Sequence, residues 1–409
     1  MRNLVLSLAL FAAASVAAKT QTQTLEITNP LDTKRVDAPV NVSLGHVPFA
    51  VSQAIVTING KEIPSQLDDI TGDGSADALC FLIDIDKKQT VKAEIRYSDT
   101  GEQPQYKARV YVDMMLTNKK IKETNKQDLY IDQLKVNRGV NPYWMLHHHG
   151  AAFESELAAY RIYFDHRQTV DIYGKISKQL ELKQTQFYPD EQQKAAGFGD
   201  DILWVGNTLG VGALRGFDGK QPVMLEDLDH RAQRIVSKGP LRTIVEVLDE
   251  NWIPAPGAEK VTMITYYTLY AGHRDCDVSC VFNRNTTNSY CTGVINVKNS
   301  EEFSDKNGLR GCWGTDWPVS AKDSVGHKRE TVGLGICIPK QNIVRELHAN
   351  KDNYAFVVKA KERSINYNIV FGSDNETFGF HTAKAWFAYL KEWKKELANP
   401  LKITMGKLD

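Results

Sequence analysis

Cysteine is scarce in this 409-residue chain, which has six and no CxxC pair. That spacing excludes the usual zinc ribbons and fingers and a thioredoxin-like redox motif. Most of the cysteines stand in apolar, strand-like contexts, which favours buried thiols, but their even number leaves one or two disulfides in the second half of the chain open. The six are Cys80, Cys276, Cys280, Cys291, Cys312 and Cys337.

An excess of charge of either sign is also lacking, with 50 basic and 50 acidic residues. Such a balance does not favour nucleic acid or an anionic membrane surface as a partner. After residue 18 no apolar stretch approaches the roughly 20 residues that a membrane-spanning helix needs. We therefore expect no nucleic-acid partner and no membrane span.

The longest apolar run opens the chain, MRNLVLSLALFAAASVAA at 1–18, with Arg2 as its only charge. A basic start, an apolar middle and a small-residue end are typical of a secretory signal peptide. A retained interfacial anchor is the alternative. We expect residues 1–18 to be a signal peptide and the mature protein to be periplasmic or secreted.

Long helical patterns are scarce, and short alternating segments rich in Val, Ile, Thr and Tyr dominate. The clearest helix is 382–400, which Pro400 ends. A polar, charged stretch at 117–128 separates two strand-rich regions. These patterns predict a mostly-β protein with a C-terminal helix, built from a β-sandwich-like module at 19–115 and a large antiparallel β domain at 130–409.

Three adjacent histidines, His147, His148 and His149, precede Gly150. If the segment is extended, His147 and His149 share one face and form two ligands of a metal site, although no third ligand stands nearby. A structural role in a turn is a second interpretation. The third is an active-site base, because a neutral imidazole accepts protons near neutral pH.

The following run, 154–175, supports the third interpretation. Strict alternation puts Arg161 and Tyr163 on one face, and Glu154 and Tyr160 on the other. Both faces thus carry polar side chains, as expected where one of them lines a cleft. Arg161 is suited to grip a carboxylate with two parallel hydrogen bonds, and a cross-strand ion pair is the equally weighted alternative.

A second cluster lies in 311–327, which is rich in Gly, Pro and Ser and predicts a long loop. Trp313 and Trp317 beside Asp316 are suited to stacking on sugar rings and bonding their hydroxyls, or they pin the loop to the sheet. Three basic side chains are secondary candidates for substrate binding: His327, Lys328 and His230.

A third feature is DDITGDGSAD at 68–77. Asp69, Asp73 and Asp77 approximate the start of a calcium loop, with a glycine at the turn. Cys80 stands where an EF-hand has its bidentate glutamate, so this is not an EF-hand. A structural calcium ion and an acidic turn without metal both remain open.

Four segments together resemble exported proteins of bacterial polysaccharide-utilisation loci, a family catalogued as domain of unknown function 4861. They are 63–82, 149–175, 197–214 and 314–334. The resemblance implies a small N-terminal β domain followed by a galactose-mutarotase-like β-supersandwich, as in several polysaccharide lyases. The family is also expected to include oligosaccharide dehydratases, which act on uronate-containing chains, and the resemblance implies this activity for the present protein.

A dehydratase or lyase of this kind removes the C5 proton of a uronate and protonates the oxygen leaving C4, without a cofactor. We expect His149 as the base or its partner, Tyr160 or Tyr163 as the acid, and Arg161 on the substrate carboxylate. The cationic candidates suggest an anionic oligosaccharide. The alternatives are a non-catalytic glycan-binding protein using Trp313 and Trp317, or an epimerase or glycoside hydrolase using carboxylates. The carboxylate candidates are Glu154, Glu156 and Asp316.

Overall fold

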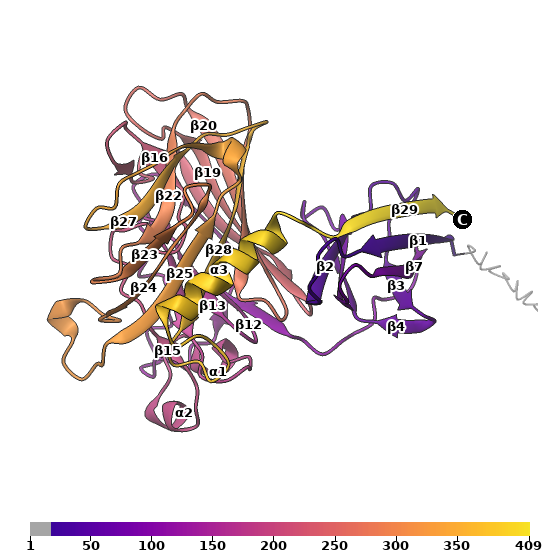
Figure 1. Ribbon diagram of the computed structural model, residues 1–409, viewed down its shortest axis with the longest axis horizontal. Helices are drawn as coiled ribbons and strands as arrows, with labels where there is room; N and C mark the ends of the chain where they lie inside the picture. The colour runs from indigo at the N-terminus through magenta and orange to yellow at the C-terminus, as the bar shows by residue number, and fades with distance from the viewer. Residues whose placement is uncertain (1–17) are drawn as a thin grey trace, which may run out of the picture.

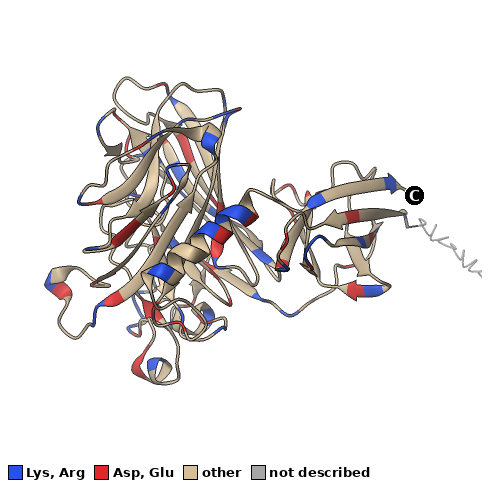
Figure 2. Cartoon of the chain, in the orientation of Figure 1, with Lys and Arg blue, Asp and Glu red and all other residues tan. Residues whose placement is uncertain are grey.

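The computed structural model describes residues 18–409, which form a small β unit and a large one (Figure 1). The predicted signal peptide therefore lies, except for Ala18, outside the described residues. Within 18–409 no helix has the length and apolar character needed to cross a bilayer. Basic and acidic side chains are interspersed over both units, without a stripe of one sign (Figure 2).

The small unit packs a five-stranded sheet, β29-β1-β7-β3-β4, against a three-stranded sheet, β2-β6-β5. Its strands alternate buried and exposed residues, as in β1, where Leu25 and Ile27 are fully buried between the sheets. The strands are β1 (Thr20–Thr28), β2 (Arg35–Ser43), β3 (Gln53–Ile58), β4 (Lys61–Ile63), β5 (Ser65–Asp68), β6 (Ala78–Ile85), β7 (Thr90–Ser98) and β29 (Lys402–Leu408).

The predicted module boundaries differ from the structure at both ends. The last strand, β29, returns to the small unit and pairs antiparallel with β1, so the large unit does not extend to residue 409. At the other end, β8 (Val110–Asp113) pairs with β12 (Gly150–Ser155) of the large unit, although the sequence assigned it to 19–115. Strand pairing over such separations depends on the assembled fold, which local patterns do not reveal.

The large unit contains a nine-stranded antiparallel sheet, β11-β18-β19-β20-β21-β28-β25-β24-β23. Two five-stranded sheets, β15-β14-β13-β12-β8 and β17-β16-β22-β27-β26, share one continuous apolar core with it. The strands of the large sheet are β11 (Gln133–Asn137), β18 (His230–Lys238), β19 (Arg242–Trp252), β20 (Val261–Tyr270), β21 (Asp275–Phe282), β28 (Ser364–Ser373), β25 (Glu330–Cys337), β24 (Leu309–Asp316) and β23 (Glu301–Ser304).

The remaining elements are short and lie around this sandwich. The other strands of the two five-stranded sheets are β13 (Ala159–Tyr163), β14 (Val170–Gly174), β15 (Asp200–Asp201), β16 (Arg215–Phe217), β17 (Pro222–Val223), β22 (Tyr290–Ile295), β26 (Ile343–Glu346) and β27 (Asn353–Val358). Two further strands, β9 (Met115–Leu116) and β10 (Leu129–Tyr130), pair with each other, and α1 (Leu182–Thr185) and α2 (Glu191–Ala195) are single turns. The prediction of a mostly-β antiparallel fold is confirmed.

The predicted C-terminal helix is α3 (Ala383–Leu397), which lies across the large unit and leads into β29 (Figure 1). The Thr382 hydroxyl accepts a hydrogen bond from the Ala385 amide and so caps the helix. Trp386, Leu390 and Trp393 are buried against β24 and β25 at helical spacing. Their core-facing role, predicted from the sequence, is confirmed.

Two ion pairs join the two units, one of them buried and the other partly exposed. Arg242 of the large sheet contacts Asp68 of β5 at 2.6 Å, and Arg109 contacts Asp37 of β2 with bonds of 2.6 and 2.8 Å. Charges removed from water are tolerated where each has its partner. These pairs hold the small unit against one end of the large one.

All six cysteines are free and buried. Burial raises the pKa of Cys80, Cys280, Cys291 and Cys312 to about 12, which makes them inert at neutral pH. The disulfides that the even count left open do not form, because each thiol packs separately in the β core.

Candidate functional site

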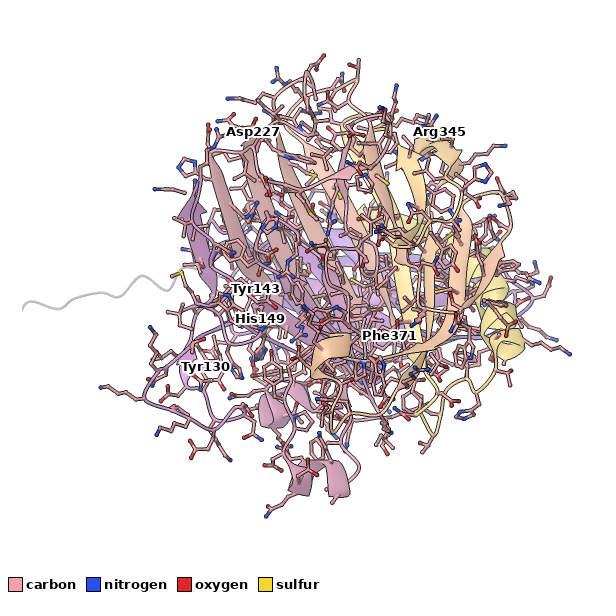
Figure 3. The ribbon with its side chains drawn as sticks, turned by 90° about the vertical axis from the view of Figure 1, so that its left-hand side faces the viewer. Tyr130, Tyr143, His149, Asp227, Arg345 and Phe371 are labelled. Carbon is pink, nitrogen blue, oxygen red and sulfur yellow. The ribbon has the colours of Figure 1, made fainter. Side chains whose placement is uncertain are left out.

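A cavity of about 660 Å³ opens at one end of the sheet that contains β13 and β14. Its walls come from five segments: 141–149, 161–167, 188, 201–207 and 318–319. Figure 3 shows Tyr143 and His149 side by side on this face of the large unit. Of the residues that the sequence singled out, three line the cavity: His149, Arg161 and Tyr163.

His149 is held in an unusual conformation. Its φ of 64° lies in the left-handed region, which costs a residue with a side chain about 1–3 kcal/mol. The imidazole stacks on the Tyr143 ring at 3.8 Å with an interplanar angle of 5°. Gly150 follows because a Cβ there would lie 1.7 Å from the Ile162 carbonyl oxygen. The local backbone therefore presents this one imidazole to the cavity.

The hydrogen bonds of His149 determine its tautomer. Nδ1 lies 3.0 Å from the Tyr143 carbonyl oxygen, which can only accept, so Nδ1 carries the proton. Nε2 then has a lone pair, and within residues 18–409 it has no hydrogen-bond partner. Burial, with smaller effects of Arg161 and Arg167, lowers the pKa of His149 to about 4. The side chain is therefore a neutral base at pH 7.

The other two histidines do not share this position. Residues 147–149 form a turn rather than an extended strand, so the predicted common face of His147 and His149 is wrong. His148 is fully buried beside Asp113, and burial lowers its pKa well below the usual value. Within the described residues no group of three or more His, Cys, Asp or Glu is arranged to hold a metal ion.

Arg161 is the centre of a buried ion-pair cluster. It stands opposite Asp171 on β14, and Nη2 contacts Asp171 at 2.6 Å and Asp201 at 2.7 Å. Nη1 donates to the Tyr188 hydroxyl at 3.0 Å. Only 4% of the side chain is exposed. Burial disfavours the charge, but Tyr163, Asp201 and Asp171 together raise the pKa of Arg161 well above its usual value. The cross-strand ion pair, one of two predicted roles, is what the structure contains.

The two candidate tyrosines lie on opposite faces, as their parity predicted. Tyr163 lines the cavity, and its hydroxyl donates to Asp171 at 2.7 Å. Tyr160 is fully buried in the core, where its hydroxyl donates to the Arg274 carbonyl at 2.5 Å. Its proposal as an acid is wrong, because its face of β13 packs against the large sheet.

Sequence reasoning missed two acids at the cavity, Tyr188 and Asp201. The Tyr188 oxygen accepts from Arg161, and its own proton has no acceptor within residues 18–409. Burial raises the pKa of Tyr188 above its usual value. Burial and the charge of Asp171 raise the pKa of Asp201 to about 8, against the opposing effect of Arg161. Tyr188 is therefore protonated at neutral pH, and Asp201 keeps a proton to a higher pH than an ordinary aspartate.

Arg167 was missed as well. Its guanidinium pairs with Asp165 at 2.6 Å and lies over the rings of Tyr143 and Tyr163, at 4.6 and 4.8 Å. With 15% of the side chain exposed, it is more accessible than Arg161. The sequence contained a signal for this residue in YFDHRQ at 163–168, where Arg167 stands two positions after Asp165 and so shares a face with it in an extended segment.

The predicted loop 311–327 is partly a strand, since β24 continues to Asp316. Trp313 is buried against Trp386 of α3, so it pins the strand. The Trp317 ring lies beneath Arg329, at 5.2 Å, and does not line the cavity. Trp313 thus takes the second of its two predicted roles, and neither indole lines the cavity. The loop reaches the cavity through its next two residues, Pro318 and Val319.

The remaining candidates lie outside the cavity. Glu154 is fully buried, with Lys175 at 2.5 Å and the amides of 181 and 182. Asp316 accepts the Trp317 amide, and His230 pairs with Glu250 at 3.2 Å. His327 and Lys328 are exposed, and Lys328 lies 3.5 Å from Glu330. These five side chains have structural or surface roles.

The acidic turn at 68–77 uses its carboxylates internally. Asp69 accepts the amides of Gly72, Asp73 and Gly74, and Asp77 accepts the Thr71 amide. Asp73 accepts the Ser75 amide. The predicted calcium site with Asp69, Asp73 and Asp77 finds no convergent ligand set here, because these oxygens satisfy the backbone of the turn.

Two solved structures are similar to the chain at low identity. One is an alpha-mannosidase from Enterococcus faecalis V583, with 8% identity over 94% of this chain and 46% of its own, and a TM-score of 0.45. The other is a protein in glycosyl hydrolase family 38 from Enterococcus faecalis, with 9% identity over 94% and 47%, and the same TM-score. The chain spans about half the length of either structure, and these values establish neither a common fold nor a common activity.

A comparison with curated protein sequences finds no match. The sequence model of the family described as "Domain of unknown function (DUF4861)" matches residues 27–403, which include both β units and the cavity. The chain therefore belongs to the DUF4861 family.

Proposed function

We propose that this protein is an exported carbohydrate-active enzyme that eliminates across C4–C5 of a uronate in an oligosaccharide, as a dehydratase or lyase. The observation that carries the proposal is the unpartnered Nε2 of His149, held as a neutral base in a cavity with two proton donors. Proton abstraction and leaving-group protonation require this combination.

The first step is removal of the C5 proton by Nε2 of His149. This proton is weakly acidic until the charge of the adjacent carboxylate is balanced. Arg167, which is partly exposed, and protonated Asp201 are placed to interact with that carboxylate. A bound carboxylate also offsets the arginine charges that lower the pKa of His149, and so strengthens the base.

The second step is departure of the oxygen at C4. The electrons of the C5–H bond form the C4–C5 double bond, the C4–O bond breaks, and Tyr188 gives its proton to the leaving oxygen. The product is water if that oxygen is a free hydroxyl, and a shortened sugar chain if it is a glycosidic oxygen. His149 then returns its proton to solvent and Tyr188 takes one up, which restores both groups, and the step needs no redox cofactor because nothing is oxidised or reduced overall.

Arg161 and Tyr163 act on these donors rather than on the substrate. Arg161 donates to Tyr188 and contacts Asp201, and Tyr163 donates to Asp171 behind it. Hydrogen bonding to a hydroxyl oxygen stabilises the anion that proton donation leaves. Their predicted contact roles are thus replaced by positioning roles.

The test is incubation of the purified protein with a panel of uronate oligosaccharides. Elimination produces an ultraviolet-absorbing conjugated double bond, and dehydration lowers the product mass by one water. Loss of both signals in the His149→Ala protein, with an unchanged circular dichroism spectrum, supports the assignment. Wild-type protein without either signal on any uronate contradicts it.

A second candidate is a glycan-binding protein without catalysis, which two exposed tryptophans at the cavity favour: Trp144 and Trp204. It predicts saturable binding with unchanged oligosaccharide. The hydrolase alternative has less support, because Glu154, Glu156 and Asp316 are absent from the cavity wall.

A further inference from the structure

The tryptophans of this chain are unevenly placed. All seven lie in the described residues, and four are buried: Trp252, Trp313, Trp386 and Trp393. Trp317 is half-buried beneath Arg329. The two exposed ones are Trp144, with 77% exposure, and Trp204, with 50%. Both line the cavity of His149. Large apolar faces left in water at one site indicate a ligand that covers them.

We propose that Trp144 and Trp204 are platforms for pyranose rings, and that the substrate is a chain of sugars that continues beyond the unit at His149. This deepens the proposed function by naming the binding sites of a polymer-derived ligand. A pyranose has an apolar face of C–H bonds and a rim of hydroxyls, so it suits an indole bordered by polar groups.

Trp144 lies at the side of the base. Its ring stands nearly perpendicular to the stacked pair of Tyr143 and His149, with centroids 4.8 and 5.2 Å away. With 77% of the residue exposed, most of the indole is open to a ligand. A sugar ring on Trp144 therefore lies close to the His149 imidazole.

Trp204 lines the same cavity and follows Asp201 by three residues in the sequence. The neighbouring Asn207 is anchored through its backbone, because Arg215 donates to its carbonyl at 2.8 Å. Within residues 18–409 the side-chain amide of Asn207 has no hydrogen-bond partner. It is thus available for a sugar hydroxyl beside the second indole.

The cavity does not end at the reacting groups. A second hollow of about 290 Å³ shares Asn141 and His166 with the first and extends to Arg138 and Glu226. Asn141 and His166 therefore lie between two neighbouring hollows, and the second is available to a further unit of the chain. A ligand that occupies both hollows is longer than a monosaccharide.

Binding is measured by calorimetry with galacturonate and glucuronate and their oligomers of up to four units, with neutral manno- and cello-oligosaccharides beside them. Affinity is expected to rise with length. Trp144→Ala and Trp204→Ala should each weaken binding of the longer oligomers about tenfold, and Trp204→Phe by less, since a smaller aromatic face remains. Tyr130→Ala, at an equally exposed aromatic residue outside the cavity, is the matched control and should change nothing.

His166→Ala tests the path into the second hollow. It should weaken trisaccharide binding more than monosaccharide binding. An equal loss at all lengths, unchanged affinity in both tryptophan variants, or absence of wild-type binding to every panel member overturns the inference. Binding by the tryptophans without elimination supports the inference and contradicts the proposed function. Elimination that requires His149 but neither tryptophan supports the proposed function and contradicts the inference.

Discussion

Tyr143 holds His149 twice, through its carbonyl oxygen 3.0 Å from Nδ1 and through its ring stacked on the imidazole at 3.8 Å. The hydrogen bond to the backbone carbonyl determines the tautomer of His149, and the stacking determines the orientation of its ring. A base whose lone pair is aimed by main-chain atoms does not depend on a neighbouring carboxylate.

Replacing His149 by Ala should lower turnover of the true uronate substrate by about 10²–10⁴-fold, the usual loss for a general base. His327→Ala is the matched control, because that histidine is exposed and outside the cavity. Steady-state rates and circular dichroism are measured for both proteins. Near-normal activity in a folded His149→Ala protein would show that another group takes the proton.

The pH dependence of kcat/KM should be bell-shaped. His149 works unprotonated, so activity falls as pH drops below its pKa of about 4. Asp201 works protonated, so activity falls as pH rises above its pKa of about 8. In Asp201→Asn the alkaline decline should disappear, because an amide does not titrate there. An alkaline limb that persists in this variant would contradict the role of Asp201.

Two tyrosine-to-phenylalanine substitutions should distinguish the tyrosine that donates a proton from the tyrosine that only stabilises the core. Tyr188→Phe removes the donor and should cost about 10²–10⁴-fold in rate, and also about 1–3 kcal/mol of unfolding free energy because Nη1 of the buried Arg161 loses its acceptor. Tyr160→Phe removes only the bond to the Arg274 carbonyl and should cost about 1 kcal/mol of unfolding free energy with activity retained. Rates and denaturant unfolding are compared. The opposite pattern would return Tyr160 to the site.

Arg161→Met should destabilise the fold. It leaves the fully buried carboxylate of Asp171 without its cation, and breaking such a pair costs about 3–5 kcal/mol. Lys cannot reproduce the divergent bonds to Asp171, Asp201 and Tyr188, so Arg161→Lys should recover stability only in part. A variant as stable as wild type in urea, yet unable to bind uronates, would instead make Arg161 the substrate clamp.

Local patterns were sufficient for elements whose period matches their burial. Leu25 and Ile27 alternate into the small core, and Trp386, Leu390 and Trp393 repeat at helical spacing in α3. The parity argument also placed Arg161 and Tyr163 on one face of β13 and Tyr160 on the other. Each result depends only on neighbours within one element.

Site roles were less predictable, because side chains distant in sequence share the cavity. Asp171 lies ten residues after Arg161 and satisfies it across the sheet, and Asp201 and Tyr188 arrive from a later segment. An arginine that binds a substrate carboxylate and an arginine in an internal ion pair have the same appearance in the sequence. Trp313 and Trp317 likewise resemble sugar platforms in the sequence, but Trp313 lies on strand β24 and is buried in the structure.

By itself the sequence determined the β class, the C-terminal helix and the segment from which His149 lines the cavity, since alternation, helical period and residue chemistry are local properties. The tertiary structure decided the return of β29 to the first sheet and the free state of the thiols. It also decided which tryptophans meet water at the cavity. Those outcomes depend on which surfaces are brought together, and the free energy of burial acts on the assembled surfaces rather than on single segments.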